Sequence, residues 1–138
     1  MDAAQALQRV IEDSSQIRAA CVFDSRGAPI ASTLADEAAT SRFVEAAAAL
    51  LDAAESVPRD AVAGPLAQLE ASTPEGSVFV VRDGERAVAA VTRPEPTVGL
   101  VFFDLKSCLR DIAAPGDEDA RPRPKARKRE TSASESPA

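Results

Sequence analysis

Hydrophobic positions change their spacing several times along the chain, and each change predicts a new element. Near the N-terminus they recur at the three- and four-residue spacing of an amphipathic helix, at Ala3, Ala4, Leu7, Val10 and Ile11. We expect this helix to end near Asp13. Residues 17–23 are then mostly apolar over the length of one strand. The pattern predicts a helix followed directly by a strand.

A tight turn follows that strand. The sequence Asp24-Ser25-Arg26-Gly27 separates residues 17–23 from the next strand-like segment, residues 28–33. Glycine supplies the positive φ of a tight turn, so the two segments are predicted to form an antiparallel hairpin. Pro29 fits best near a strand start or on a sheet edge.

The longest predicted element is a second helix that ends before Pro58. Thr33, followed three residues later by Asp36, resembles a capping box with Asp in place of Glu. The helical period predicts that one face packs on a sheet. That face holds Phe43, Ala47, Leu50, Leu51 and Ala54.

A stripe of small residues runs beside that face. It consists of Ala39, Ala46, Ala49 and Ala53. Exposed helix surfaces of this length usually carry more Glu, Lys and Arg, so the stripe suggests close approach of another helix. The high helix propensity of alanine is the alternative explanation.

Three further strands and a last helix complete the pattern. Residues 66–72, 77–81 and 86–92 are predicted strands, and Asp83-Gly84 is typical of a two-residue hairpin. The final segment alternates spacings of four and three, which predicts a helix over residues 97–113. The positions are Val98, Phe102, Leu105, Leu109 and Ile112.

The element order is therefore α-β-β-α-β-β-β-α. It predicts an α/β fold of the α+β type, a five-stranded antiparallel sheet with helices on both faces. The 138 residues are 45% hydrophobic, which suits one domain, residues 1–114. From Pro115 the apolar period is lost, and an acidic patch, a basic run (residues 121–129) and a Ser-rich end follow. Residues 115–138 are predicted to be a disordered charged tail.

Composition narrows the possible partners. The chain has five Phe, no Trp, no Tyr and a net charge of −6, which argues against binding to single-stranded nucleic acid. The basic run could contact an acidic partner, anionic lipid or nucleic acid, but a solubilising tail is the simpler interpretation. No apolar stretch approaches the roughly 20 residues that span a bilayer, so we expect no integral membrane segment. The N-terminus does not read as a signal peptide.

Cysteine usage is consistent with a cytoplasmic protein. Cys21 and Cys108 each lie in an apolar segment, so we expect buried free thiols in a reducing compartment. A disulfide or a shared metal is the alternative. Structural zinc usually has four Cys or His ligands, and the chain has no His.

Catalytic patterns are missing. Without His, the commonest general base and every Ser-His or Cys-His pair are excluded. The glycines stand singly, so no phosphate loop forms and no nucleotide or other cofactor is expected. The carboxylate pairs Asp36-Glu37 and Asp52-Glu55 are interpreted as solvated surface charge. Arginines in or beside loops could contact phosphates or an acidic partner; they are Arg59, Arg82 and Arg86. We therefore predict that the protein is not an enzyme.

The third predicted strand, residues 66–72, offers a surface for self-association. If it lies at the sheet edge, its free backbone groups invite pairing with a second copy. No Lys guards it, and alternate residues face opposite ways. Together with the alanine stripe it predicts an isologous dimer interface, formed by Leu66, Gln68, Leu69, Glu70, Ala46, Ala49 and Ala53.

The same segments resemble the roadblock / dynein light chain family, especially its bacterial members, over roughly residues 3–113. The resemblance lies in A-L-Q-R-V-I-E-D, I-R-A-A-C-V-F-D-S-R-G-A-P-I-A-S-T, a long helix beginning D-E-A-A-T, two strands around D-G, and T-V-G-L-V-F-F-D-L. The D-S-R-G-A-P-I-A-S hairpin is the most characteristic piece. The charged tail departs from the family pattern.

What the resemblance implies is a homodimer with the third strands joined into one sheet and the second helices side by side on one face. The first and last helices would lie on the other face. Family members scaffold or regulate Ras-like small GTPases, and some bacterial members stimulate hydrolysis by reshaping the active site of the GTPase. The alternative is a profilin-like or PAS-like ligand-sensing module, which requires a pocket with convergent polar groups.

Overall fold

The computed structural model describes residues 1–57 and 67–113. The predicted tail, Leu66 and Arg59 lie outside these ranges, as does the domain boundary at residue 114. The described elements follow the predicted order. They are α1 (Ala3–Asp13), β1 (Ile17–Asp24), β2 (Pro29–Ser32), α2 (Glu37–Glu55), β3 (Gln68–Thr73), β4 (Gly76–Asp83), β5 (Arg86–Thr92) and α3 (Val98–Ala113).

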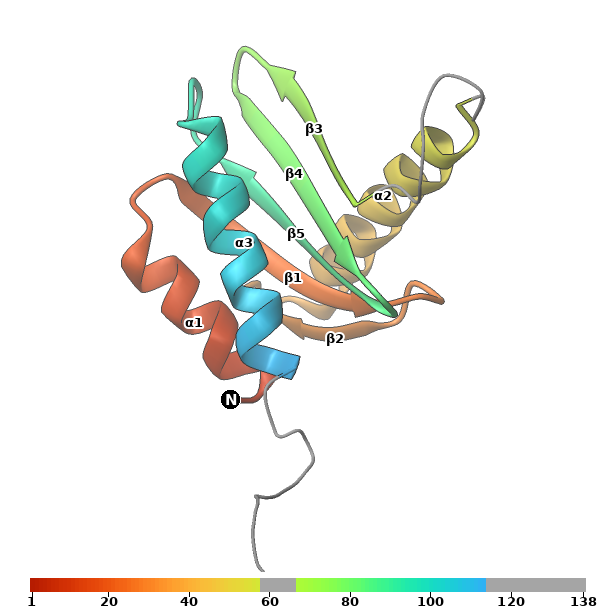
Figure 1. Ribbon diagram of the computed structural model, residues 1–138, viewed down its shortest axis with the longest axis horizontal. Helices are drawn as coiled ribbons and strands as arrows, with labels where there is room; N and C mark the ends of the chain where they lie inside the picture. Colours follow the sequence, from red (N-terminus) through yellow and green to blue (C-terminus); the bar gives the residue numbers. More distant parts are fainter. Residues whose placement is uncertain (58–66, 114–138) are drawn as a thin grey trace, which may run out of the picture.

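The strands form one antiparallel sheet in the order β2-β1-β5-β4-β3. Helices α1 and α3 lie together on one face, and α2 lies on the other (Figure 1). The predicted α+β class, with a five-stranded antiparallel sheet and helices on both faces, is confirmed.

Each face of the sheet has its own hydrophobic cluster, because neighbouring residues of a strand point to opposite faces. Val22 of β1 belongs to the cluster under α1 and α3, whereas Phe23 belongs to the cluster under α2. In the first cluster the rings of Phe79 and Phe102 meet edge to face, with centroids 5.0 Å apart. Burial of each large side chain contributes about 1.5–3 kcal/mol to stability.

Both cysteines are buried and free, as predicted. Cys21 lies under α2, and Cys108 lies on the opposite face of the sheet, in α3. Burial raises the pKa of each thiol to about 12.

The turn between β1 and β2 is held by Asp24. Its carboxylate accepts hydrogen bonds from the backbone N–H groups of Arg26 and Ala28, each at 2.9 Å. These bonds lower the pKa of Asp24, so the turn keeps an ionised carboxylate. Gly27 adopts the positive φ of 79° that the sequence predicted for this turn. Strand β2 is short, and its register against β1 shifts between Val22 and Phe23.

The predicted cap of the long helix was wrong. The N-cap is Asp36, whose carboxylate accepts from the N–H of Ala38 at 3.1 Å. The hydroxyl of Thr33 instead accepts from the N–H of Ala20 on β1, at 3.0 Å. Thr33 is thus engaged by the sheet, and α2 begins at the next residue whose side chain can satisfy its free N–H groups.

The buried residue Gln16 joins the segment between α1 and β1 to the segment between β5 and α3. Gln16 is 4% exposed, and its side-chain oxygen accepts from the N–H of Thr97, just before α3. Its backbone oxygen accepts from the N–H of Arg93. Within residues 1–57 and 67–113, no helix has the length and apolar character needed to cross a membrane.

Candidate interaction surface

Strand β3 lies at the edge of the sheet, which is the condition on which the predicted dimer interface depends. It pairs with β4 from Gln68 opposite Val81 to Thr73 opposite Gly76, and no described strand lies on its other side. Its outward backbone groups are therefore available for pairing with another strand. Lys, Arg and Pro are absent from Gln68–Thr73.

The side chains of β3 divide between the two faces of the sheet. Leu69 lies opposite Val80, a residue of the cluster under α2. Glu70 lies opposite Phe79, on the face that α1 and α3 cover, and accepts a hydrogen bond from the hydroxyl of Ser72. Leu69 on one face and Glu70 on the other are each less buried than their partners Val80 and Phe79 on β4, so the edge is open on both sides.

Helix α2 does not cover the whole width of the sheet. It packs closest to β1 and β2. Glu37, Thr40 and Ser41 share a hollow with β2, so one flank of the helix faces that strand. A five-stranded sheet is roughly 20 Å wide, whereas a helix with its side chains is about 10–12 Å across. The part of this face formed by β4 and β3 is therefore incompletely covered.

A set of half-buried apolar residues lies at this uncovered part, and we call it the apolar shelf. The helix period puts its α2 members on the flank turned away from β2. Its members are Phe43, Leu50, Ala54, Leu69 and Val78.

The buried face of α2 is accordingly rotated from the predicted one. Ala47 and Leu51 are buried as expected, and Val44 is buried with them. Phe43, Leu50 and Ala54 of the predicted face are only half-buried, because they border the uncovered strands. The apolar pattern of the sequence showed that these residues avoid water. They are only half-buried because the sheet is wider than α2, and this width is not contained in the sequence pattern of the helix.

The alanine stripe lies on the solvent side of α2. Ala46, Ala49 and Ala53 are exposed, and Ala39 is half-buried. Side chains this small let another helix approach the backbone of α2 closely. The stripe adjoins the apolar shelf, because Ala46 and Leu50 are four residues apart and so lie next to each other on the helix surface.

An ion pair fixes the C-terminal end of α2 to the sheet. Glu55 accepts a hydrogen bond from the guanidinium of Arg82 on β4, and both side chains are less than one-third exposed. The prediction that Glu55 is solvated surface charge was therefore wrong, because the next strand supplies a cation. Asp36, Glu37 and Asp52 are exposed as predicted.

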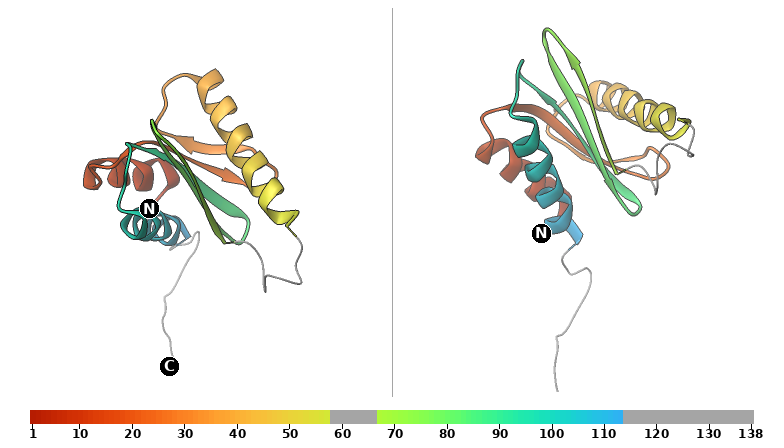
Figure 2. Two further views of the ribbon diagram at one scale, coloured as in Figure 1. Left: turned by 90° about the horizontal axis from the view of Figure 1, so that it is seen from above. Right: turned by 45° about the horizontal axis from the view of Figure 1, so that its top comes forward.

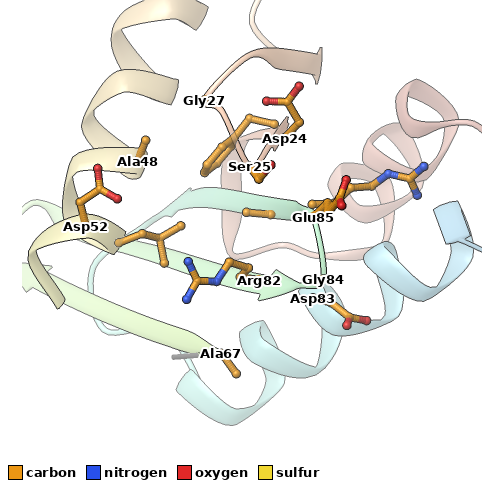
Figure 3. Close-up of a pocket in the computed structure, with 14 residues that line it drawn as sticks. Asp24, Ser25, Gly27, Ala48, Asp52, Ala67, Arg82, Asp83, Gly84 and Glu85 are labelled. Carbon is orange, nitrogen blue, oxygen red and sulfur yellow. The ribbon is translucent and has the colours of Figure 1, made fainter. Parts of the chain in front are cut away.

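Arg82 also borders a hollow of about 520 Å³ between α2, the β1–β2 turn and the β4–β5 turn (Figure 3). The floor is apolar and includes Phe23 and Leu51. Two polar groups at the hollow already have partners, since Arg82 binds Glu55 and Asp24 binds its own turn. Because Arg82 and Asp24 are already paired within the protein, they are better suited to holding the fold together than to binding a ligand.

The described residues contain no group of three or more His, Cys, Asp or Glu side chains that could hold a metal ion. Arg86 is exposed at the start of β5. Of the predicted interface residues, Gln68, Leu69 and Glu70 lie on the edge strand β3, and Ala46, Ala49 and Ala53 lie on the solvent side of α2. Leu66 is the seventh, and it lies outside the described residues.

Figure 2 shows the sheet between the layer of α1 and α3 on one side and α2 on the other. Known structures share this architecture. The Roadblock/LC7 domain from Streptomyces avermitilis matches with a TM-score of 0.72 at 11% identity, covering 81% of this chain and 95% of that one. MglB from Myxococcus xanthus matches at 0.68 and 13% identity, covering 80% and 84%. A chain of the LokiProfilin2/rabbit actin complex matches at 0.53 and 10% identity, covering 80% and 96%. These identities are low, so the likeness concerns the fold alone.

The sequence itself was also compared with known proteins. Curated protein sequences gave no match. The sequence pattern of the Roadblock/LC7 domain matches residues 3–93, from the start of α1 to the residue after β5. That match covers well over half of the chain, and so this protein belongs to the Roadblock/LC7 domain family.

Proposed function

We propose that this protein is a non-enzymatic homodimer that regulates or scaffolds a small Ras-like GTPase. The observation that carries the dimer is the open edge of β3 beside the apolar shelf and the alanine stripe. The GTPase rests on family membership and on the resemblance described for the sequence. We place the module at residues 1–114 and the protein in the cytoplasm.

In the proposed dimer, β3 pairs antiparallel with β3 of a second copy across a twofold axis. Gln68 and Glu70 then lie on one face of the joined strands, and Leu69 lies on the other. The α2 helix of the partner approaches the same axis and covers the apolar shelf. Alanine side chains at Ala46, Ala49 and Ala53 permit the two α2 helices to pack closely. One contact thus satisfies the strand edge and removes apolar surface from water.

The dimer is tested by substituting Leu69. Leu69→Arg puts a charge and a long side chain at the joined edge, so we expect the mass from light scattering to fall to that of a monomer. Ile30→Arg is the matched control, because Ile30 is 47% exposed on β2, at the opposite edge of the sheet. Its mass should equal that of the wild type. A wild-type mass in Leu69→Arg would refute the interface.

The GTPase is tested with a small GTPase encoded beside the gene for this protein. Purified GTPase is mixed with the dimer, co-elution is measured with GDP and with GTP bound, and the rate of GTP hydrolysis is measured with and without the dimer. Because the chain offers no catalytic constellation, we expect any stimulation to survive replacement by Ala of Arg86, an exposed arginine at the start of β5. Lack of binding in both nucleotide states would sink the proposal.

The hollow beside Arg82 leaves one competing function to be tested, a ligand-sensing module. Such a module would raise its melting temperature when its ligand binds. A thermal-shift screen of small metabolites tests this, with Leu51→Trp as the variant that fills the hollow. A hit that this variant abolishes would support ligand sensing.

A further inference from the structure

Two hollows adjoin each other at the end of the sheet where α3 stops. The first is the hollow beside Arg82, between α2 and the β1–β2 and β4–β5 turns, and we call it the α2 hollow. The second, the α3 hollow, has a volume of about 310 Å³ and lies between the end of β4 and the last turns of α3. Arg82 and Asp83 border both. A chain that leaves α3 therefore meets the α3 hollow first and reaches the α2 hollow past Asp83.

The α3 hollow is bordered by basic side chains. Lys106 and Arg110 line it, and both are exposed. Asp111, the next residue along the helix, forms an ion pair with Arg9 of α1 at 3.7 Å, so its negative charge lies on the flank toward α1. Positive charge therefore adjoins the C-terminal end of α3 on the side of the hollow.

The α2 hollow carries the opposite charge. Its charged lining residues are four acidic and two basic ones, Asp24, Asp52, Asp83, Glu85, Arg82 and Arg86 (Figure 3). The guanidinium of Arg82 is already paired with Glu55. Within residues 1–57 and 67–113, the side chains of Asp52, Asp83 and Glu85 form no hydrogen bond or ion pair. An apolar floor with a net negative rim fits a segment that is basic and has long aliphatic stems.

The sequence that follows α3 carries the complementary charges in the complementary order. Residues 117–119 are all acidic, and the basic run at residues 121–129 comes next. Along the surface, the basic α3 hollow comes first and the acidic α2 hollow second. A segment that is acidic and then basic therefore pairs with this surface in one direction. The opposite order of charges would put like charges together.

The number of residues between α3 and these charges is sufficient for the contact. Asp117 is four residues beyond Ala113, and Arg121 is eight residues beyond it. An extended chain covers at most about 3.3–3.6 Å per residue, so the two lie up to roughly 14 Å and 28 Å from the end of the helix. Lys106 is about 10 Å back along the helix axis. Pro115-Gly116 is a dipeptide typical of turns, which a chain needs in order to fold back along α3.

We propose that residues 117–129 dock along the two hollows of their own chain. The acidic patch lies across Lys106 and Arg110, and the basic run crosses Asp83 into the α2 hollow. There the stems of its Arg and Lys side chains cover the apolar floor, and their charged ends meet the rim carboxylates. Tethering favours this segment over a free basic peptide, because it gives an effective concentration on the order of millimolar. The contact is independent of the proposed dimer, since neither hollow includes a residue of the apolar shelf or the alanine stripe.

A nitroxide spin label on the tail tests the contact in the full-length protein. Ala126→Cys carries the label in the basic run, and the two native thiols are buried, so they should stay unlabelled. We expect the label to broaden the amide NMR signals of the β1–β2 and β4–β5 turns, and not those of the β3–β4 turn at the other end of the sheet. The broadening should disappear in about 1 M NaCl, where the Debye length is about 3 Å. No broadening at low salt, or equal broadening of both ends of the sheet, would overturn the proposal.

Neutralising the rim tests the site itself. In the labelled protein, Asp83→Asn with Glu85→Gln removes two carboxylates, and Asn-Gly is a favoured hairpin dipeptide, so the turn should form. We expect the broadening to fall at least several-fold. Glu75→Gln with Glu95→Gln is the matched control, because it makes the same change in net charge at two exposed residues at the opposite end of the sheet. Equal broadening in the two double variants would overturn the site.

A second label position tests the order of the charges. Ala120→Cys, between the acidic patch and the basic run, should broaden the amides of Lys106 and Arg110 more than those of the β1–β2 turn. Ala126→Cys should do the reverse. The opposite pattern would contradict the direction in which the tail is proposed to lie.

A mixed sample separates the chain's own tail from that of a second copy. Isotope-enriched wild type without a spin label is incubated with spin-labelled Ala126→Cys that is not enriched. Because the contact is within one chain, we expect no broadening of the enriched protein. Broadening of its β4–β5 turn would show a tail from another copy and overturn the contact as proposed.

Discussion

Single residues in this domain show how the environment, more than the residue type, decides chemical behaviour. Cys21 and Cys108 were predicted to be buried from their apolar neighbours alone, and the structure confirms it. The raised pKa of Asp104 had no such signal, because its causes are desolvation and a charge on another helix. A sequence pattern indicates whether a residue is buried away from water. The pKa of a group also depends on the charges that the fold puts beside it.

The thiols should be unreactive in the folded protein. With a pKa of about 12 for Cys21 and for Cys108, only roughly one thiol in ten thousand is ionised at pH 8, and the thiolate is the reactive form. We expect no reaction with a disulfide reagent such as DTNB over an hour in native buffer. Both thiols should react within minutes in denaturant. Fast reaction of either thiol in the native protein would contradict its burial.

Asp104→Asn should stabilise the domain near neutral pH. Desolvation, and then the charge of Asp13, raise the pKa of Asp104 in the folded state. The folded protein thus binds this proton more tightly than the unfolded chain, so stability falls as the pH rises through the two pKa values. Asp104→Asn has no carboxyl to ionise, so it does not lose this stability as the pH rises. We expect a gain of a few tenths of a kcal/mol at about pH 7, reduced by solvent screening.

Urea unfolding at two pH values checks this prediction. At about pH 3, below the pKa of Asp104 in both states, the carboxyl is protonated and the gain should vanish. A gain of equal size at both pH values would point to a change in packing instead of the charge.

At the scale of elements, the order and approximate bounds of all eight were predictable from periodicity and turn residues. Two details were not. The cap of α2 moved from Thr33 to Asp36 because Thr33 bonds to Ala20, a neighbour in space and not in sequence. The half-burial of Phe43 and Leu50 follows from the width of the sheet, which the helical period of one segment does not contain.

The turn between β3 and β4 should depend on Gly76. A Cβ on Gly76 would lie 2.3 Å from the backbone oxygen of Thr92 on β5, and the residue has φ of 156°. Gly76→Ala must therefore displace a neighbouring strand, and we expect a loss of about 2–4 kcal/mol. Thermal unfolding measures the loss.

Gly99→Ala is the matched control for that substitution. No atom lies within 4 Å of a Cβ added to Gly99, and the residue is in the first turn of α3. The same change should be neutral or stabilising there, by up to about 1 kcal/mol, because alanine favours the helix. If both variants lost the same stability, crowding at Thr92 would not be the cause.

At the scale of the whole molecule, the uneven covering of the sheet is the feature that matters. One face carries two helices and the other carries one, so apolar surface remains beside β3. The Roadblock/LC7 family match fixes the fold, and the open edge gives the proposed dimer a physical reason. Neither the fold nor the proposed dimer follows from composition. Composition showed only that the chain can form a compact core and has few side chains suited to catalysis.

If the folded state is a dimer, its melting temperature should rise with protein concentration, because association favours the folded form by mass action. We expect an upward shift over a hundredfold range of wild-type concentration. Leu69→Arg should melt at a temperature that does not depend on concentration. Differential scanning calorimetry of both proteins measures this. A flat dependence for the wild type would contradict coupled folding and association.

The opposite edge of the sheet decides how far strand pairing can extend. Strand β2 has only four residues, begins with Pro29, and lies where the register of β1 shifts. Short length, proline and irregular register all discourage further pairing. In the language of polymer chemistry, a sheet with two open edges is a bifunctional monomer that grows into fibres. A sheet with one blocked edge has a valence of one, and its growth through strands terminates at a pair.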